Sequence, residues 1–163
     1  MRSLTLTTVG LLALQCMLGG AYGQQATPPA HAAPADDSIP SANLLQPEEL
    51  VPLLSRSGGD KPLVFQVGPK VFYAEAHVPG SEYIGAGKDE SGLEALRNRV
   101  KNLKHDQFIV LYCGCCPWKK CPNVHPAYQQ LVSLGFNRVK VMYIADNFGK
   151  DCVAKGYPVE KSR

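Results

Sequence analysis

The sequence predicts an α/β protein built around one parallel sheet with helices on both faces. Three short apolar runs, over residues 63–67, 107–112 and 139–144, have the composition of buried strands. Segments with helical spacing of apolar residues separate these runs, and such alternation is typical of parallel sheets. The chain has 163 residues, 45% hydrophobic and 19% charged, which favours one globular domain.

The first half of this domain contains three predicted helices. Pro47 and the two acidic residues after it suit the first turn of a helix, and Gly58 ends the segment that follows. Pro79-Gly80 breaks regular structure and predicts a turn. The expected elements here are a helix from residue 47, a short helix over 71–76, a turn over 77–81 and a helix over 90–103.

The second half repeats a strand, loop and helix pattern. The strand over 107–112 leads into a cysteine-rich loop, after which helical spacing resumes over 126–134 and Gly135 ends that helix. After the strand over 139–144, a short helix is expected over 147–155 and an extended tail over 157–159. The strand followed by a helix is a βα unit, with the loop at the carboxyl end of the strand.

The N-terminal residues have the pattern of an export signal. Arg2 precedes an apolar stretch over residues 4–20, and small residues follow, so we expect a signal peptide over 1–23. Threonines and glycines interrupt the stretch, so no transmembrane segment is expected after cleavage. Residues 24–43 are rich in proline and alanine and are predicted to be a flexible linker before a domain over 44–163. The protein is therefore expected to be exported, either periplasmic or secreted.

Charge and cysteine content limit the partners. The net charge of +3, from 17 basic and 14 acidic residues, is too small and dispersed to predict nucleic-acid binding. Signal cleavage would leave five of the six cysteines. In an oxidising compartment these are free to pair, with at least one thiol left over.

Four cysteines lie within nine residues of the loop after the second strand: Cys113, Cys115, Cys116 and Cys121. Cys113 comes at the carboxyl end of a parallel strand and faces a helix start, where backbone N–H groups are expected to lower its pKa. It is the candidate catalytic nucleophile. The candidate substrate-binding residues of the loop are Gly114, Cys115, Cys116, Trp118, Lys119 and Lys120, whose two lysines favour a thiolate and an approaching anion.

The other loop cysteines leave several interpretations open. Cys116 or Cys121 would serve as a resolving thiol for Cys113 in thiol–disulfide exchange, or the two would form a disulfide that pins the loop. Four cysteines so close together also raise zinc or an iron–sulfur cluster as an interpretation. One short loop makes a strained tetrahedral cage, so neither a metal nor a cofactor is expected.

Five short motifs occur at characteristic places over residues 44–161. They are Pro47-Glu-Glu-Leu50, Ala76-His-Val-Pro-Gly-Ser81, the strand 109–112 leading into Cys113, Leu134-Gly-Phe136 and Gly156-Tyr-Pro-Val159. With these motifs the sequence resembles the rhodanese-like family, which implies a five-stranded parallel α/β fold. The resemblance also implies sulfurtransferase activity with Cys113 carrying a persulfide, a small sulfur-containing anion as donor and a thiol acceptor.

The sequence departs from the family pattern at three places. Gln66-Val67-Gly68 stands where the family usually has Asp-Val-Arg, which removes an ion-pairing arrangement. The cysteine loop is longer and has lysines in place of an arginine, and Cys152 takes the place of a tryptophan often found near the last helix. These departures keep two other functions open, a thiol oxidoreductase or redox sensor and a non-catalytic binding module.

Two histidines are further candidate site residues, and phosphate ester hydrolysis is a further candidate function. His77 is expected to fix its turn through hydrogen bonds, whereas His125 either tunes Cys113 or is a solvated residue at a helix end. Phosphatases that share the fold clamp phosphate with an arginine at the end of their cysteine loop. None occurs between Cys113 and His125, which counts against phosphate ester hydrolysis.

Overall fold

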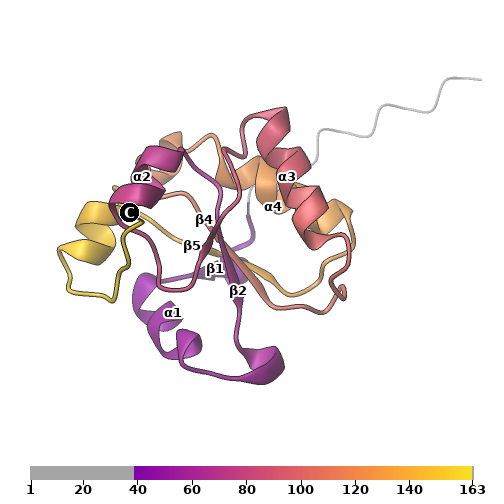
Figure 1. Cartoon of the computed structure of the whole chain (residues 1–163), viewed down its shortest axis with the longest axis horizontal. Helices are drawn as coiled ribbons and strands as arrows, with labels where there is room; N and C mark the ends of the chain where they lie inside the picture. Colours follow the sequence, from indigo (N-terminus) through magenta and orange to yellow (C-terminus); the bar gives the residue numbers. More distant parts are fainter. Residues whose placement is uncertain (1–38, 163) are drawn as a thin grey trace, which may run out of the picture. The chain divides into compact units, whose positions relative to one another are not determined.

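Five parallel strands form the centre of the structure, a computed structural model that describes residues 39–162 (Figure 1). The strands are β1 (Leu44–Leu45), β2 (Leu63–Gln66), β3 (Glu82–Tyr83), β4 (Ile109–Tyr112) and β5 (Val139–Met142). Their order across the sheet is β1-β5-β4-β2-β3, so β4 is the middle strand. The predicted α/β class and five-stranded parallel sheet are confirmed.

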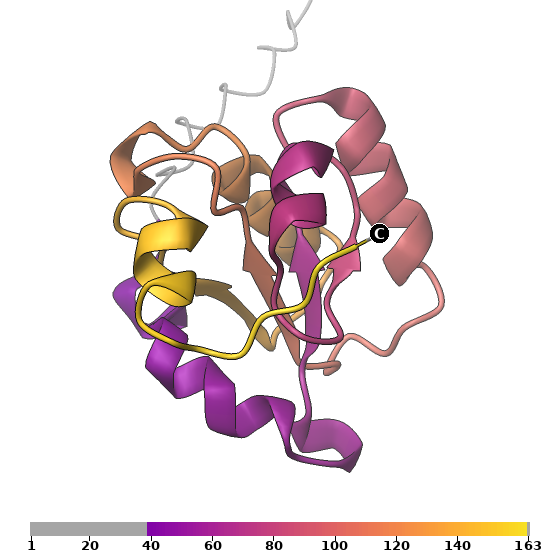
Figure 2. The same cartoon turned by 60° about the vertical axis from the view of Figure 1, so that its left-hand side comes forward.

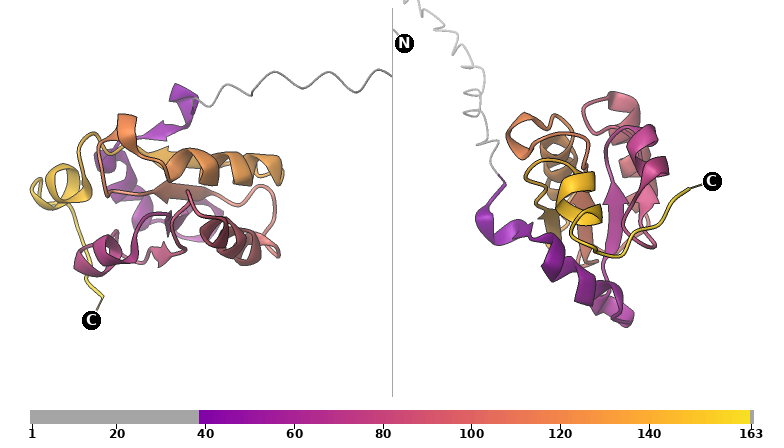
Figure 3. Two further views of the ribbon diagram at one scale, coloured as in Figure 1. Left: turned by 90° about the horizontal axis from the view of Figure 1, so that it is seen from above. Right: turned by 90° about the vertical axis from the view of Figure 1, so that its left-hand side faces the viewer.

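The helices connect the strands and lie on both faces of the sheet (Figures 1 and 3). They are α1 (Pro47–Leu54), α2 (Lys70–Glu75), α3 (Glu90–Val100) and α4 (Val124–Ser133), with 3-10 turns η1 (Ser41–Asn43), η2 (Gly58–Asp60) and η3 (Trp118–Lys120). The helix predicted over 147–155 is a single π-helical segment, η4 (Gly149–Val153). Helix α3 ends three residues before the predicted boundary, and α4 begins two residues earlier than predicted.

Alternating side chains of β4 divide the core into two layers. Ile109 and Leu111 belong to the cluster that packs against α3 and α4, whereas Val110 and Tyr112 belong to the cluster on the other face. That second cluster includes residues of α1 and η4, and Figure 2 shows the yellow η4 segment beside α1. All four residues of β4 are buried, as a middle strand covered on both faces requires.

The folded domain begins before the predicted boundary. Ile39 is only 8% exposed and packs in the α3 and α4 layer, and Asn43 Nδ2 donates a 2.6 Å hydrogen bond to the Tyr128 hydroxyl on α4. The prediction that residues 39–43 belong to a flexible linker is therefore wrong. The predicted signal peptide and the rest of the linker lie outside the described residues. Among residues 39–162, no helix has the length and apolar character that crossing a membrane requires.

Candidate functional site

Cys113 directly follows β4, and neighbouring backbone encloses it at the edge formed by the carboxyl ends of the strands. Its side chain belongs to the buried core, with only 3% of the residue exposed. Gly68, just after β2, packs so closely that a Cβ at this position would lie 2.7 Å from Cys113 Sγ. A side chain at position 68 would therefore require Cys113 or Gln66 to shift.

Gln66 makes neutral hydrogen bonds at the position where the family pattern has an ion-pairing aspartate. Its Nε2 donates to the Cys113 carbonyl oxygen at 3.0 Å, and its Oε1 accepts from the Gly68 N–H at 3.2 Å. The residue is 1% exposed, so both bonds are shielded from water. Gln66 thus fixes the backbone on both sides of the buried sulfur without a buried charge.

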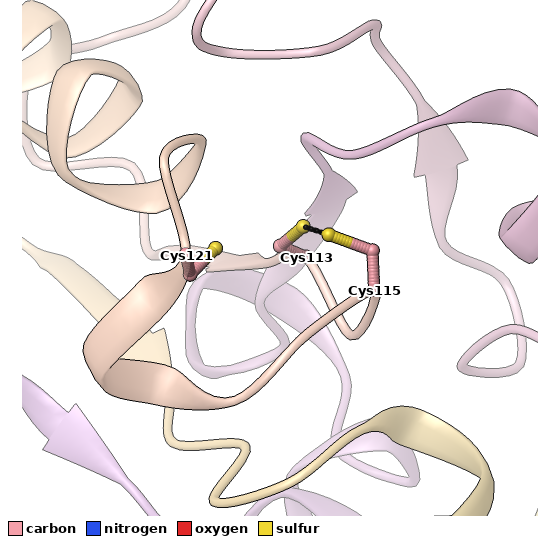
Figure 4. A group of neighbouring side chains, drawn as sticks. All are labelled: Cys113, Cys115 and Cys121. Carbon is pink, nitrogen blue, oxygen red and sulfur yellow. Dashed lines mark hydrogen bonds between the residues drawn. The ribbon is translucent and has the colours of Figure 1, made fainter.

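The loop brings three cysteine sulfurs together (Figure 4). The Sγ atoms of Cys113, Cys115 and Cys121 all lie within 4.8 Å of one another, and Cys113 and Cys115 are 3.0 Å apart. Cys116 Sγ lies 3.2 Å from Cys115 Sγ, and all five cysteines of the described part of the chain are free thiols. The structure therefore contains no Cys116–Cys121 disulfide within residues 39–162, and the Cys115 thiol is in contact with that of Cys113.

Gly114 makes this convergence possible. Its φ of +75° lies in the left-handed region that favours glycine, and it reverses the chain directly after β4. A Cβ at Gly114 would lie 2.8 Å from the Phe148 Cβ, and the Gly114 carbonyl accepts a 2.9 Å hydrogen bond from the Phe148 N–H. The loop is therefore held against the segment that leads into η4.

Asn123 is a site residue that the sequence did not reveal. It is 1% exposed, and its Nδ2 donates to Cys113 Sγ at 3.3 Å and reaches Cys115 Sγ at 3.8 Å. Its Oδ1 accepts a 3.2 Å hydrogen bond from the Lys88 N–H. Asparagine is common at the position before a helix as a cap, but here its side chain makes no capping bond to α4. Its position in the sequence therefore suggested only a helix start.

The start of α4 acts on Cys121, and the prediction that it lowers the pKa of Cys113 is wrong. The pKa of Cys121 is lowered to about 5, chiefly by its interaction with the Cys113 thiol and also by the Asn123 and Val124 N–H groups. The pKa of Cys113 is raised, first by its interaction with Cys121 and then by burial. The start of α4 therefore favours the thiolate of Cys121 over that of Cys113.

Of the remaining predicted loop residues, Trp118 lines a small cavity and the two lysines are exposed. Trp118 packs against Tyr143, with 5.0 Å between ring centroids, and lines a cavity of about 10 Å³ beside Cys113 and Cys121. Lys119 and Lys120, also on η3, are exposed to solvent. His125 lies beside Trp118 at a ring separation of 5.7 Å.

A larger cavity connects the loop with solvent. It has a volume of about 250 Å³ and is lined by Gly114, Cys115 and Phe148 on one side and by Phe72 and Glu75 of α2 on the other. Cys115 is partly exposed, in contrast to Cys113. The cavity thus opens the Cys115 member of the sulfur cluster to solvent.

His77 and Cys152 lie apart from the sulfur cluster. His77 Nδ1 is hydrogen-bonded to the Tyr73 carbonyl oxygen at 2.8 Å, and its ring stacks on the Tyr73 ring, so the side chain ties the start of the predicted turn to α2. Cys152 is buried on the α1 face of the sheet. Burial and then the charge of Asp151 raise the pKa of Cys152 to about 12.

Comparisons with known proteins identify the fold. No protein-family model matches the sequence, and comparison with curated proteins finds no significant match. The solved Alr3790 protein from Anabaena sp. matches with a TM-score of 0.53 and 16% identity over 72% of this chain and 82% of that one. A structure described as the Rhodanese_3 like domain of the same Anabaena protein has 19% identity over 63% and 94% of the two chains, with a TM-score of 0.45.

The BH2092 protein from Bacillus halodurans is also similar, with 24% identity and a TM-score of 0.45. The match covers 61% of this chain and 64% of BH2092, so this chain spans less than two thirds of that protein. Together with the five-stranded parallel sheet, the match to Alr3790 shows that the chain has the rhodanese-like fold. At these identities the likeness concerns the fold alone.

Proposed function

We propose that the protein is an exported sulfurtransferase in which Cys113 carries a sulfane sulfur atom as a persulfide. The observation that supports this proposal is the position of Cys113 at the carboxyl end of the middle strand of a rhodanese-like fold. Ligands of open α/β sheets bind outside the carboxyl ends of the strands. The donor would be a small sulfur-containing anion such as thiosulfate, and the acceptor a thiol.

The transfer consists of two displacements at sulfur. The Cys113 thiolate attacks the outer sulfur of thiosulfate, the sulfur–sulfur bond of the donor breaks, and sulfite leaves with its electron pair. A nucleophilic acceptor then attacks the outer sulfur of the persulfide and regenerates the Cys113 thiolate. With cyanide as acceptor, the product is thiocyanate, and no external oxidant or reductant is consumed.

The groups around Cys113 have distinct roles in this scheme. The Cys121 sulfur lies within 4.8 Å of Cys113 Sγ, but with its pKa lowered to about 5 it is too weak a base to hold the Cys113 proton, which would pass to solvent as the attack begins. The Asn123 amide donates to Cys113 Sγ and would stabilise negative charge on the sulfur. The exposed Lys119 and Lys120 would attract the anionic donor toward the loop.

The proposal is tested by mass spectrometry of the reduced protein before and after thiosulfate treatment. We expect a gain of roughly 32 Da on Cys113 that cyanide removes as thiocyanate. Cys113→Ser should abolish the gain and the thiocyanate, whereas Cys152→Ala, which removes a buried thiol on the opposite face, should retain both. Thiocyanate production by Cys113→Ser would contradict the proposal.

Thiol–disulfide exchange is a second candidate because two thiols lie in contact. The 3.0 Å separation of Cys113 and Cys115 adds Cys115 as a candidate resolving residue beside the predicted Cys116 and Cys121, and the Cys121 sulfur also lies within 4.8 Å of Cys113 Sγ. Forming a disulfide between Cys113 and Cys115 would release two electrons and two protons, which a disulfide substrate would accept. Reduction of such a substrate that depends on both residues, without any sulfur gain, would favour this function over sulfur transfer.

A further inference from the structure

We propose that Cys113, Cys115 and Cys121 form a binding site for one soft metal ion, which the three sulfurs hold as Cu(I). The site goes beyond sulfur transfer and needs no sulfur donor. The three sulfurs come from different parts of the loop, namely the end of β4, the residue after Gly114 and the residue after η3. Their convergence within 4.8 Å of one another is the observation that carries the proposal.

The three sulfurs could bind one shared ion if Cys113 Sγ and Cys115 Sγ moved slightly apart. A metal–thiolate bond of about 2.3 Å requires sulfurs roughly 3.8 to 4.0 Å apart, as the edges of a tetrahedron or a trigonal plane. None of the three sulfur–sulfur distances exceeds 4.8 Å, so the sulfurs are near this spacing. The distance of 3.0 Å between Cys113 Sγ and Cys115 Sγ must increase by about 1 Å. Cys115 is partly exposed, so rotation of its side chain can supply that movement.

The chemistry of the ligand set selects the class of ion. The converging group offers sulfur alone, without a carboxylate or an imidazole among the described residues, and thiolates favour soft ions such as Cu(I). Structural zinc sites take four protein ligands. A set of three sulfurs therefore favours Cu(I), whereas zinc would need a further ligand such as Cys116, whose sulfur is 3.2 Å from Cys115 Sγ.

The residues around the three sulfurs orient them and leave a path from solvent to Cys115. The Asn123 amide donates toward both Cys113 and Cys115, as a group that orients thiolate ligands does. Gly68 packs against Cys113 Sγ, and Gln66 donates a hydrogen bond to the Cys113 carbonyl oxygen, so this ligand is fixed before an ion binds. The cavity of about 250 Å³ beside Cys115 lets an ion enter from solvent.

The path of the loop removes the objection that its short length raised against a metal site. The spacing of the cysteines suggested a strained tetrahedral cage made by one short loop. The reversal at Gly114 and the tight turn of η3 instead fold the loop back, so that residues 113, 115 and 121 meet without a fourth cysteine. Three ligands avoid the strain that a four-cysteine cage would impose.

The experiment is a Cu(I) titration of the full chain, reduced and free of oxygen, in competition with a chromophoric Cu(I) chelator. We expect one Cu(I) per chain, with X-ray absorption showing three sulfur neighbours. Cys113→Ser, Cys115→Ser and Cys121→Ser should each weaken binding about tenfold or more. Cys116→Ser, in the same loop, and Cys152→Ala, on the other face, are the matched controls and should bind like the wild type.

Three results would overturn the proposal: wild-type affinity in any of the three ligand variants, loss of binding in Cys116→Ser, or tight binding of Zn(II) with four sulfurs in place of Cu(I). Circular dichroism checks that each variant is folded, and for a variant that is not, the absorption spectrum of the wild-type complex decides the ligand number. The titration contains no sulfur donor. Failure of sulfur transfer therefore leaves the metal site standing, and failure of metal binding leaves sulfur transfer standing.

Discussion

Replacing Asn123 by alanine removes a buried amide that links two parts of the site. The wild-type side chain donates to Cys113 Sγ at 3.3 Å and accepts from the Lys88 N–H at 3.2 Å. A buried polar group left without its partner costs about 1–3 kcal/mol. Because Lys88 is exposed and water can replace the lost acceptor of its N–H, we expect the free energy of unfolding to fall by about 1–2 kcal/mol.

The same substitution should slow sulfur transfer. A hydrogen bond to a charged group contributes about 1.5–3 kcal/mol, so losing the donor next to an anionic sulfur should lower the rate on the order of 10- to 100-fold. Asn123→Asp keeps an acceptor for Lys88 but places a carboxylate oxygen against the sulfurs. We expect it to lose more activity than the alanine variant, because the carboxylate repels a thiolate.

The assay measures initial rates of cyanide-dependent thiocyanate formation alongside urea denaturation of each variant. Asn43→Ala is the matched control, because it removes an asparagine side chain that donates a hydrogen bond to Tyr128, away from the loop. It should lose stability and keep its rate. A wild-type rate in Asn123→Ala, or an equal loss of rate in Asn43→Ala, would refute the reasoning.

Three further substitutions test packing next to Cys113 and packing and ionisation on the opposite face of the sheet. Gly68→Ala places a Cβ 2.7 Å from Cys113 Sγ, so overpacking should lower stability by about 1–3 kcal/mol in urea denaturation, and an unchanged midpoint would contradict the close contact. Tyr112→Phe leaves the buried Val78 N–H without its 3.1 Å partner and should cost about 1–3 kcal/mol, measured in the same way; a loss below the lower bound would show that water replaces the hydroxyl. The pKa of Cys152 is raised from 9.0 to about 12 in the folded protein. Between these values the unfolded chain loses the thiol proton and the folded protein keeps it, so the free energy of unfolding is unaffected below pH 9 and falls as the pH rises toward 12. Cys152→Ala should therefore show a shallower loss of stability above pH 9, and identical slopes for the two proteins would argue against the raised pKa.

Local patterns predicted the inner strands but not the edges of the sheet. The runs that became β2, β4 and β5 are apolar and bounded by turn residues, so their composition alone marks them. The edge strands β1 and β3 are two residues long, too short for any periodicity to develop. Pairing with β5 and β2 defines them, which is a property of the assembled sheet.

The sequence by itself determined the α/β class, the strand that ends at Cys113 and the presence of a cysteine loop before a helix. These features follow from the period of apolar residues and from turn chemistry, both of which act over a few neighbouring positions. Only the tertiary structure decided which sulfurs meet, that Asn123 faces them and that the lowered pKa belongs to Cys121. The physical reason is that the path of the loop depends on distant contacts, in which Gly68 packs on Cys113 and Phe148 packs on Gly114.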